Sequence, residues 1–408
     1  MNDTTASTPP TGTTPRRARL IVAVTAIAAL IVGAVAIGAW SRAGGSADAG
    51  STALEIRMQT LVDAGYPAVL ASVTDPDGDS VDVAVGDGDV DTNTPAPVDG
   101  EVRIASNTKM FVATIVLQLV EAGLVELDEP IHSYLPGLVT GDGIDGTVIT
   151  VRQLLQHTTG LPEYADQIAA DAFGVQNSYI SPRDLLDVAL TRPADFAPGE
   201  RWEYSNTNYL ILGLLIERMT DRTLAEQVQE RIVEPLELRH TYLPQAGERE
   251  LRGTHPNGYH LTDDGELRDI TTMDPSFAWS AGAIVASPSD LNTFMQALLD
   301  GTLLSAASLG EMQNSVPAGD ELWPEAAYGL GLQSFPLSCG GIAWGHGGDI
   351  PGTQTRNAVG PDGTAVTIAV TALPWAVVDV TDEEVLLAQY RLVVDALDET
   401  LCNAPAGS

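Results

Sequence analysis

Short strand-like runs with turn residues between them occur at both ends of the chain. Residues 68–73 and 81–85 flank the turn sequence DPDGDS, and this arrangement predicts a hairpin of half-buried strands. Three further runs near the C-terminus, at residues 341–344, 353–359 and 364–372, predict more strands. A long segment with a different pattern separates the two groups.

The pattern of that middle segment predicts helices. Three helix starts have a Ser or Thr cap followed three positions later by an amide or an acid, as in a capping box: Thr150 with Gln153, Ser181 with Asp184 and Ser287 with Asp290. Residues 209–219 (YLILGLLIERM) are apolar nearly all round, which predicts a buried helix. A last helix is expected at about residues 383–401. The sequence therefore predicts an α/β (α+β) fold in which a mostly helical insert interrupts the sheet-forming part.

The N-terminal part of the chain is organised differently. Residues 1–19 form a polar tail that ends in PRRAR, and residues 20–40 contain no charge. At about 1.5 Å per residue, such a run spans a hydrocarbon core of about 30 Å. Arginines before the run outnumber the one after it, so we expect a cytoplasmic tail and a transmembrane anchor. Residues 47–49 (ADA) offer a cleavage site, and a cleaved signal is the alternative.

Either interpretation exports the remainder of the chain. We expect a flexible linker at residues 41–52 and a catalytic unit at residues 53–403, located outside the cytoplasm. The chain has 55 acidic and 20 basic residues and a formal charge of −35, which argues against nucleic acid as a partner. Cys339 and Cys402 would form one disulfide in an exported chain, and two unrelated thiols are the alternative.

No metal or other cofactor is expected. Neither cysteine has metal-ligand spacing. The acidic run Asp75, Asp77 and Asp79 lacks the glycine and the terminal carboxylate of a calcium loop, so an ordinary acidic turn is the better interpretation.

The stretch IASNTKMFVA, residues 104–113, contains Lys109, the only lysine in 408 residues. Ser106 precedes it by three positions at the start of a strongly apolar helix, so the two side chains are neighbours on one face. A serine hydroxyl becomes nucleophilic when a base takes its proton. Arginine cannot be that base, whereas the pKa of a buried lysine can fall by several units. The pair therefore predicts a serine nucleophile with a lysine base; a solvated lysine is the alternative, but elsewhere this chain uses arginine.

Two further clusters complete a set of motifs. Tyr204-Ser205-Asn206 stands just before the buried helix, and residues 344–348 (WGHGG) end a late strand. Ser-x-x-Lys, Tyr-x-Asn and His-x-Gly in this order resemble the serine penicillin-recognising enzymes, in particular the class C β-lactamase and actinomycete-type D-alanyl-D-alanine carboxypeptidase branch. The resemblance covers roughly residues 55–403 and implies a β-lactamase/transpeptidase-like fold, an antiparallel sheet flanked by helices.

The resemblance also implies roles for individual residues. Ser106 would be the acylated nucleophile, Lys109 its proton acceptor and Tyr204 a proton relay to the leaving group. Asn206 would hold the amide side of the substrate. The backbone N–H groups of Ser106 and Asp349 would form the oxyanion hole. An aromatic core residue and a helix cap are the ordinary alternatives for Tyr204 and Asn206.

Other residues would line the substrate site or support it. His346 stands where many relatives have lysine, and His346, Gly348 and Gln333 would contact substrate. His157 of the HTTGL motif is expected to be structural, bonding a loop beneath the site. The spacing of Cys339 and Cys402 matches the disulfide of the carboxypeptidase type.

At three positions the chain departs from these relatives. Gly347 replaces the Ser or Thr whose hydroxyl holds a substrate carboxylate, Gln333 replaces an arginine with the same task, and Asp349 adds a negative charge there. Arg356 on the next strand would be a compensating cation.

These departures leave more than one function open. The first hypothesis is a monomeric, exported D-alanyl-D-alanine carboxypeptidase acting on peptidoglycan stem peptides. The alternative is an esterase, amidase or D-aminopeptidase of the same fold for small substrates without a free carboxylate. A β-lactamase and a non-catalytic surface binding protein are less favoured.

Overall fold

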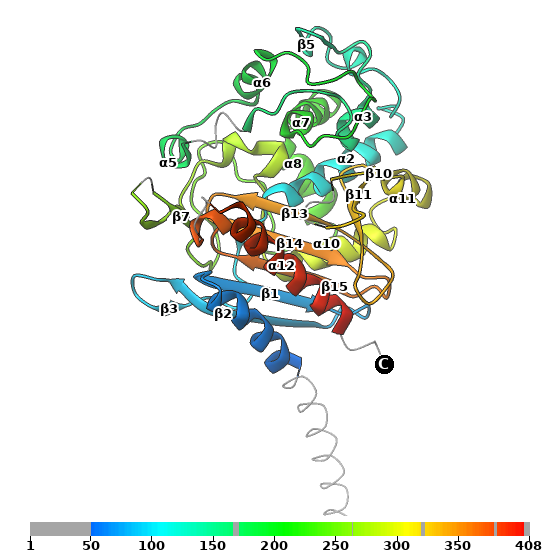
Figure 1. Cartoon of the computed structure of the whole chain (residues 1–408). Coiled ribbons are helices and arrows are strands. Elements are labelled where there is room, and N and C mark those ends of the chain that lie inside the picture. The colour runs from blue at the N-terminus through cyan, green and yellow to red at the C-terminus, as the bar shows by residue number, and fades with distance from the viewer. Residues whose placement is uncertain (1–49, 166–170, 263, 320–322, 379–381, 404–408) are drawn as a thin grey trace, which may run out of the picture. The chain divides into compact units, whose positions relative to one another are not determined.

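The computed structural model describes residues 50–403 apart from residues 166–170, 263, 320–322 and 379–381 (Figure 1). The anchor expected at residues 20–40 lies outside the described residues. Within the described part, no helix is both long and apolar enough to cross a membrane. Residues 50–63 are helical, so the last residues of the expected linker belong to a helix.

An antiparallel sheet of nine strands forms the centre of the part of the chain that the structure describes. Its order is β10-β11-β12-β13-β14-β15-β1-β2-β3, so strands from the two ends of the domain meet where β1 pairs with β15. The strands are β1 (Ala68–Thr74), β2 (Ser80–Asp89), β3 (Thr94–Pro95), β10 (Val316–Pro317), β11 (Ala327–Tyr328), β12 (Gln333–Pro336), β13 (Ile342–Ile350), β14 (Thr353–Val359) and β15 (Ala365–Val370). The predicted hairpin and late strands are confirmed. However, β13 extends beyond Trp344, so the WGHGG motif lies inside a strand and not at its end.

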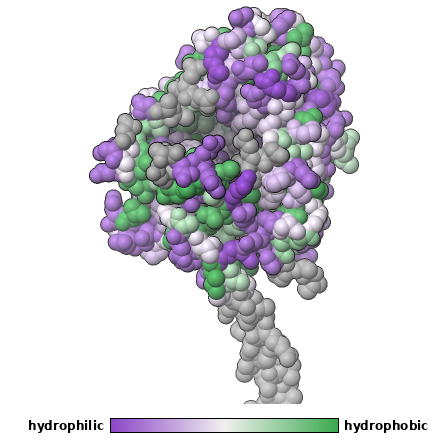
Figure 2. Space-filling view, in the orientation of Figure 1, coloured by the Kyte–Doolittle hydropathy of each residue, from purple (hydrophilic) through white to green (hydrophobic). Residues whose placement is uncertain are grey.

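Helices cover both faces of this sheet, which explains why β1 and β15 are apolar at nearly every position. On one face, Val69 and Ile368 pack with Val393 of α12 (Glu383–Asn403). On the other face, Leu70 and Ala369 belong to the cluster that contains residues of α10 (Pro288–Leu299). Hydrophilic side chains are spread over the face shown in Figure 2, in keeping with the acidic composition.

The insert between β3 and β10 is mostly helical, as expected. All three predicted caps are present: each cap hydroxyl accepts a hydrogen bond from the backbone N–H three residues on. The helix at 209–219 is confirmed as the centre of the buried α7. The helices of the insert are α2 (Thr108–Glu121), α3 (Val151–Gln156), α5 (Ala172–Val175), α6 (Pro182–Leu190), α7 (Asn206–Thr220), α8 (Leu224–Val228), α9 (Trp279–Gly282), α10 and α11 (Ala306–Gln313).

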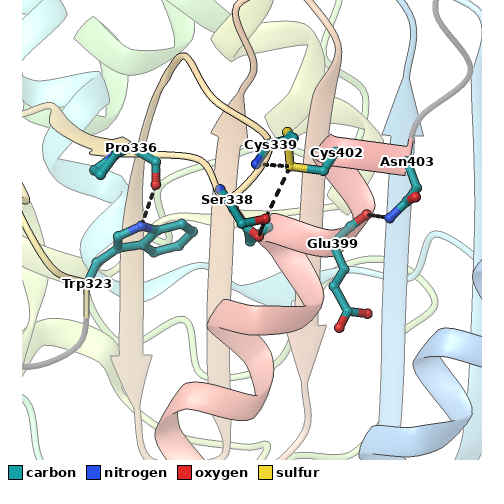
Figure 3. Close-up of a disulfide and its surroundings, with 8 residues drawn as sticks. Trp323, Pro336, Ser338, Cys339, Glu399, Cys402 and Asn403 are labelled. Atoms are coloured by element: carbon teal, nitrogen blue, oxygen red, sulfur yellow. Dashed lines mark hydrogen bonds between the residues drawn. A yellow bond between two sulfur atoms is a disulfide. The ribbon is translucent and has the colours of Figure 1, made fainter.

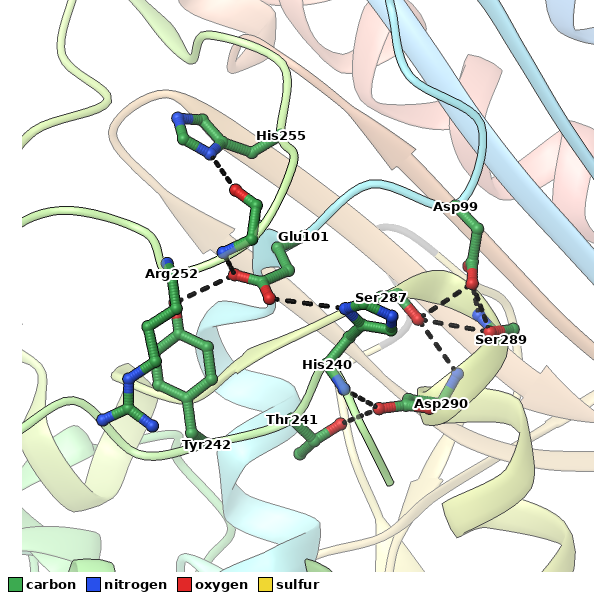
Figure 4. A network of polar contacts seen from close by, with 11 residues as sticks. Asp99, Glu101, His240, Thr241, Tyr242, Arg252, His255, Ser287, Ser289 and Asp290 are labelled. Carbon is green, nitrogen blue, oxygen red and sulfur yellow. Dashed lines mark hydrogen bonds and ion pairs between the residues drawn. The ribbon is translucent and has the colours of Figure 1, made fainter. Parts of the chain in front are cut away.

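A buried polar network anchors the chain just before Ser106 (Figure 4). Glu101 accepts hydrogen bonds from the Tyr242 hydroxyl (3.0 Å) and the Gly253 N–H (2.8 Å). Arg103, two residues further along, donates to the carbonyl oxygens of Arg249 and Met273. Burial lowers the pKa of Arg103 to about 10, so it still carries its charge at neutral pH. These contacts hold β4 (Val102–Arg103), which leads directly into the turn that carries Ser106.

The disulfide Cys339–Cys402 is present, with the two Cα atoms 5.7 Å apart (Figure 3). It joins the turn between β12 and β13 to the end of α12. The cysteines are 63 positions apart, and closing such a loop stabilises the fold by about 4 kcal/mol on the chain-entropy description. Next to it, Ser338 N–H donates to Asp398 (2.9 Å), so α12 is bonded to this turn at two points.

Candidate active site

Ser106 lies in a single 3₁₀ turn, Ala105–Asn107, that leads into α2. Ala105 has φ of 48°, a left-handed conformation that is uncommon outside glycine and often marks a functional site. Gly348 of β13 runs against this turn: a Cβ there would stand 2.2 Å from the Ile104 carbonyl oxygen. The structure therefore places Gly348, a predicted substrate contact, where the strand must approach the nucleophile turn closely.

Lys109 is fully buried and contacts Ser106 as predicted. Its Nζ lies 3.1 Å from Ser106 Oγ, 2.7 Å from Asn206 Oδ1 and 2.7 Å from the Ala281 carbonyl oxygen. Burial lowers the pKa of Lys109 to about 7, although the negative charge of Glu163 opposes the shift. The lysine can therefore be neutral at physiological pH.

The partners of Lys109 also orient the neutral amine. Asn206 Oδ1 and the Ala281 carbonyl can only accept hydrogen bonds, so they take the two N–H groups of a neutral amine. Its lone pair is then left for the Ser106 hydroxyl. This geometry permits proton transfer from Ser106 to Lys109.

Tyr204 reaches the same hydroxyl from the loop before α7. Its ring centroid lies 4.8 Å from Lys109 Nζ. Burial raises the pKa of Tyr204 well above its usual range, and a side-chain hydrogen bond with Ser106 opposes this shift only in part. Tyr204 therefore keeps its proton at neutral pH and can donate it.

Glu163 is a site residue that the motifs did not reveal. Its carboxylate accepts hydrogen bonds from the backbone N–H (2.6 Å) and the Nδ2 (3.1 Å) of Asn206. This fixes the amide so that Oδ1 points to Lys109. The available signal was its position two residues after HTTGL. Asn206 is thus held between an acid and the lysine.

His346 lines the site but uses both ring nitrogens internally. Nδ1 donates to the Gly347 carbonyl, so Nε2 accepts from the Tyr328 hydroxyl (2.9 Å). The Tyr328 oxygen in turn accepts from Nε2 of His157 (3.2 Å), whose Nδ1 accepts from the Ser205 N–H (3.2 Å). Burial, with the charge of Lys109, lowers the pKa of His346 to about 3. The histidine is therefore uncharged at neutral pH.

A cavity of about 440 Å³ opens beside Ser106, and its walls include aromatic side chains that lie outside the sequence motifs. Trp323 stacks on Phe335 with ring centroids 3.8 Å apart, and Trp202 stands two residues before Tyr204. The cavity brings together most of the predicted site residues. It is lined by Ser106, Trp202, Tyr204, Asn206, Gly319, Trp323, Ala326, Gln333, Phe335, His346, Gly347, Asp349, Arg356, Asn357, Val394 and Leu397.

One edge of β13 borders this cavity. β12 pairs only with the first half of β13, as far as Gln333 opposite Gly345. Among the described strands, none pairs on that side with His346–Ile350. An extended substrate could lie along this edge, and the assignment of the Asp349 N–H to the oxyanion hole stays a prediction.

An internal ion pair lies at the cavity. Arg356 Nη1 and Nη2 lie 3.1 Å and 3.3 Å from the two carboxylate oxygens of Asp349. Gly347 faces Arg356 across the β13–β14 register. Among the described residues that line the cavity, Arg356 is the only arginine or lysine.

The Lys109 environment predicts the pH dependence of catalysis. Because the base must be unprotonated, kcat/KM should fall about tenfold per pH unit below an apparent pKa of about 7. Glu163→Gln removes a charge that raises the pKa of Lys109, so this limb should move to lower pH. Initial rates with an ester between pH 4 and 9 measure the acid limb of the unaltered enzyme and that of the Glu163→Gln variant. A limb that stays at the same pH in the variant would contradict the assignment of Lys109 as the base.

Solved structures with the same architecture include amidases. A D-stereospecific amidohydrolase from Streptomyces sp. is 34% identical with a TM-score of 0.74, covering 82% of this chain and 97% of that one. The D-amino acid amidase from Ochrobactrum anthropi SV3, complexed with D-phenylalanine, is 26% identical with a TM-score of 0.76, covering 87% and 99%.

The matches to curated relatives cover a smaller share of each relative's length than the matches to these solved structures do. PbpX of Bacillus subtilis (strain 168), a penicillin-binding protein by name, is 26% identical over 65% of this chain and 60% of its own. Protein flp of Staphylococcus aureus (strain MW2) is 30% identical over 38% of this chain and 32% of its own. A family model, Beta-lactamase, matches residues 53–390, a range that includes the sheet, the insert and Ser106. The chain belongs to the beta-lactamase family of serine hydrolases.

Proposed function

We propose that this protein is a serine amidohydrolase that cleaves amides or esters of amino acids, D-amino acids first among them, and that its substrates lack a free carboxylate beside the scissile bond. One observation carries the proposal: Asp349 already neutralises Arg356, the cation of the cavity. Gly347 supplies no hydroxyl and Gln333 no charge. The preference for D-amino acids is supported by the amidohydrolase and amidase relatives.

The geometry supports the following sequence of steps for acyl transfer. Neutral Lys109 takes the proton of Ser106 Oγ, which attacks the carbonyl carbon to give a tetrahedral intermediate. The Tyr204 hydroxyl donates its proton to the departing amine nitrogen and is reprotonated from Lys109, so the C–N bond breaks and an acyl-enzyme remains. Water then attacks the acyl carbon and gives a proton to the same pair of residues. The bond from the acyl carbon to Ser106 Oγ breaks, Oγ takes that proton back, and the acid leaves.

This proposal reverses the order of the two hypotheses from the sequence. A carboxypeptidase must bind a free C-terminal carboxylate, and an anion placed here would meet Asp349, which is 33% exposed. Neutral His346 adds no positive charge. We further propose that the enzyme works outside the cytoplasm, on the strength of the apolar run at residues 20–40.

A matched pair of peptides tests the function. Acetyl-D-alanyl-D-alanine and its C-terminal amide differ at the terminal group, and cleavage of the D-alanyl–D-alanine bond that they share releases acetyl-D-alanine from both, so this product is the one measured. We expect kcat/KM for the amide to exceed that for the free acid by roughly tenfold or more, because the acid carboxylate meets Asp349. The corresponding L,L-peptides measure the stereochemical preference. Faster cleavage of the free acid would overturn the proposal in favour of the carboxypeptidase.

A further inference from the structure

We propose that Asp349 sets the substrate class of this enzyme. Its carboxylate is ion-paired with Arg356 and takes the position at which a substrate carboxylate would bind the guanidinium. Removing the Asp349 carboxylate should open Arg356 to substrates that end in a free acid. The inference rests on the proposed function and adds the residue that enforces it.

Arg356 is held as a receptor for an anion. Its side chain is 7% exposed, and the two oxygens of Asp349 face Nη1 and Nη2 as in a bidentate ion pair. Nη1 also donates to the Thr355 carbonyl (2.7 Å) and contacts the Gly348 carbonyl (3.4 Å). These carbonyls belong to strands β13 and β14, so the guanidinium would keep its place when Asp349 is replaced.

The strand register places the receptor beside the cavity. Arg356 is opposite Gly347, and Asp349 is two residues beyond Gly347, so both side chains point to the same face of the sheet. A Cβ on Gly347 would stand 3.1 Å from Arg356 Nη1, which shows that the guanidinium lies against this glycine. Ser106, Gly347, Asp349 and Arg356 line the same cavity. A substrate carboxylate could therefore reach Arg356 if Asp349 did not occupy it.

The charges at this point exclude a second anion. A carboxylate bound beside Asp349 would meet a like charge in a partly buried position, while the guanidinium that could offset this repulsion is already paired. Replacing Asp349 by a neutral residue removes this repulsion and frees a charged hydrogen-bond donor. Hydrogen bonds of this class are worth roughly 10- to 100-fold in affinity.

Binding to inactive variants tests the inference without turnover. In a Ser106→Ala background, calorimetry would measure the affinities for acetyl-D-alanyl-D-alanine and for its C-terminal amide. We expect Asp349→Asn to raise the ratio of acid to amide affinity roughly 10- to 100-fold. Asp349→Ser is the second variant, and Asp349→Glu, which keeps the carboxylate, is the matched control with an unchanged preference. Adding Arg356→Gln to Asp349→Asn should cancel the gain.

The outcomes separate this inference from the proposed function. An unchanged ratio in folded Asp349→Asn and Asp349→Ser proteins would overturn the inference, as would a gain that survives Arg356→Gln. Unfolding of both variants in thermal melts would also overturn it, because the pair would then be a structural requirement between β13 and β14. The proposed function fails on a different result, namely faster cleavage of the free acid by the unaltered enzyme.

Discussion

Replacing Lys109 by arginine is expected to abolish acylation of Ser106, with a loss of roughly 10⁴-fold or more in kcat/KM. The substitution keeps the positive charge but removes the ability to lose a proton near neutral pH. The site offers Nζ two acceptors, Asn206 Oδ1 and the Ala281 carbonyl, besides the Ser106 hydroxyl. An arginine guanidinium has five N–H donors, and the acceptors at this point are too few to bind all of them. Stopped-flow acylation by a p-nitrophenyl ester measures the loss.

Arginine is also larger than lysine. A second variant must therefore separate the loss of a proton-accepting amine from the steric effect of a larger side chain. Both native cysteines form the disulfide, so Lys109→Cys introduces the only free thiol. Alkylation with bromoethylamine under non-reducing denaturing conditions, followed by refolding, restores an amine of nearly the same length. We expect activity to return with an acid limb at lower pH, because the thioether withdraws electrons from the amine. Substantial activity in Lys109→Arg, or none in the refolded, alkylated protein, would remove Lys109 from the base role.

Tyr204→Phe should slow amide hydrolysis by roughly 10²- to 10⁴-fold while slowing p-nitrophenyl ester hydrolysis much less. An amine leaves only after it gains a proton, whereas p-nitrophenolate leaves unaided. Burial holds the pKa of Tyr204 well above its usual range, so the hydroxyl is present as a donor across the working pH range. Single-turnover rates with an amide and an ester of the same amino acid measure the asymmetry.

Tyr209→Phe is the matched control for this prediction. Its ring centroid lies 5.3 Å from Lys109 Nζ, but its hydroxyl donates to the Leu155 carbonyl and not to Ser106. Loss of that buried hydrogen bond should lower thermal stability and affect amide and ester equally. An equal loss on both substrates in Tyr204→Phe would show that Tyr204 positions groups without transferring a proton.

Local patterns predicted much of this protein. The cap hydroxyls at the starts of α3, α6 and α10 bond as expected, because caps depend on residues three positions apart. Ser106 and Lys109 contact each other for the same reason, since a separation of three along a helical turn makes them neighbours. The apolar runs predicted the β1–β2 hairpin, β14 and α12 closely.

Contacts between distant segments were harder to predict. Neither the position of Glu163 beside Asn206 nor the chain His157–Tyr328–His346 follows from local spacing. His346 lines the cavity, and its contact with substrate stays a prediction; the use of both its ring nitrogens within the protein does not follow from the motif. β13 continues past Trp344 because β14 pairs with it along its whole second half, and glycine-rich sequence alone does not predict a strand.

By itself, the sequence determined the class of chemistry and the fold class. A single lysine three positions after a serine, on an apolar helix, can act as a neutral base wherever the helix lies. The tertiary structure decided what the site can accept. The β13–β14 register pairs Gly347 with Arg356 and brings Asp349 within hydrogen-bond distance of the guanidinium. A register shift of one residue would place Asp349 and Arg356 on opposite faces of the sheet, because side chains alternate along a strand. Only the assembled sheet therefore shows that the cavity cation is already paired.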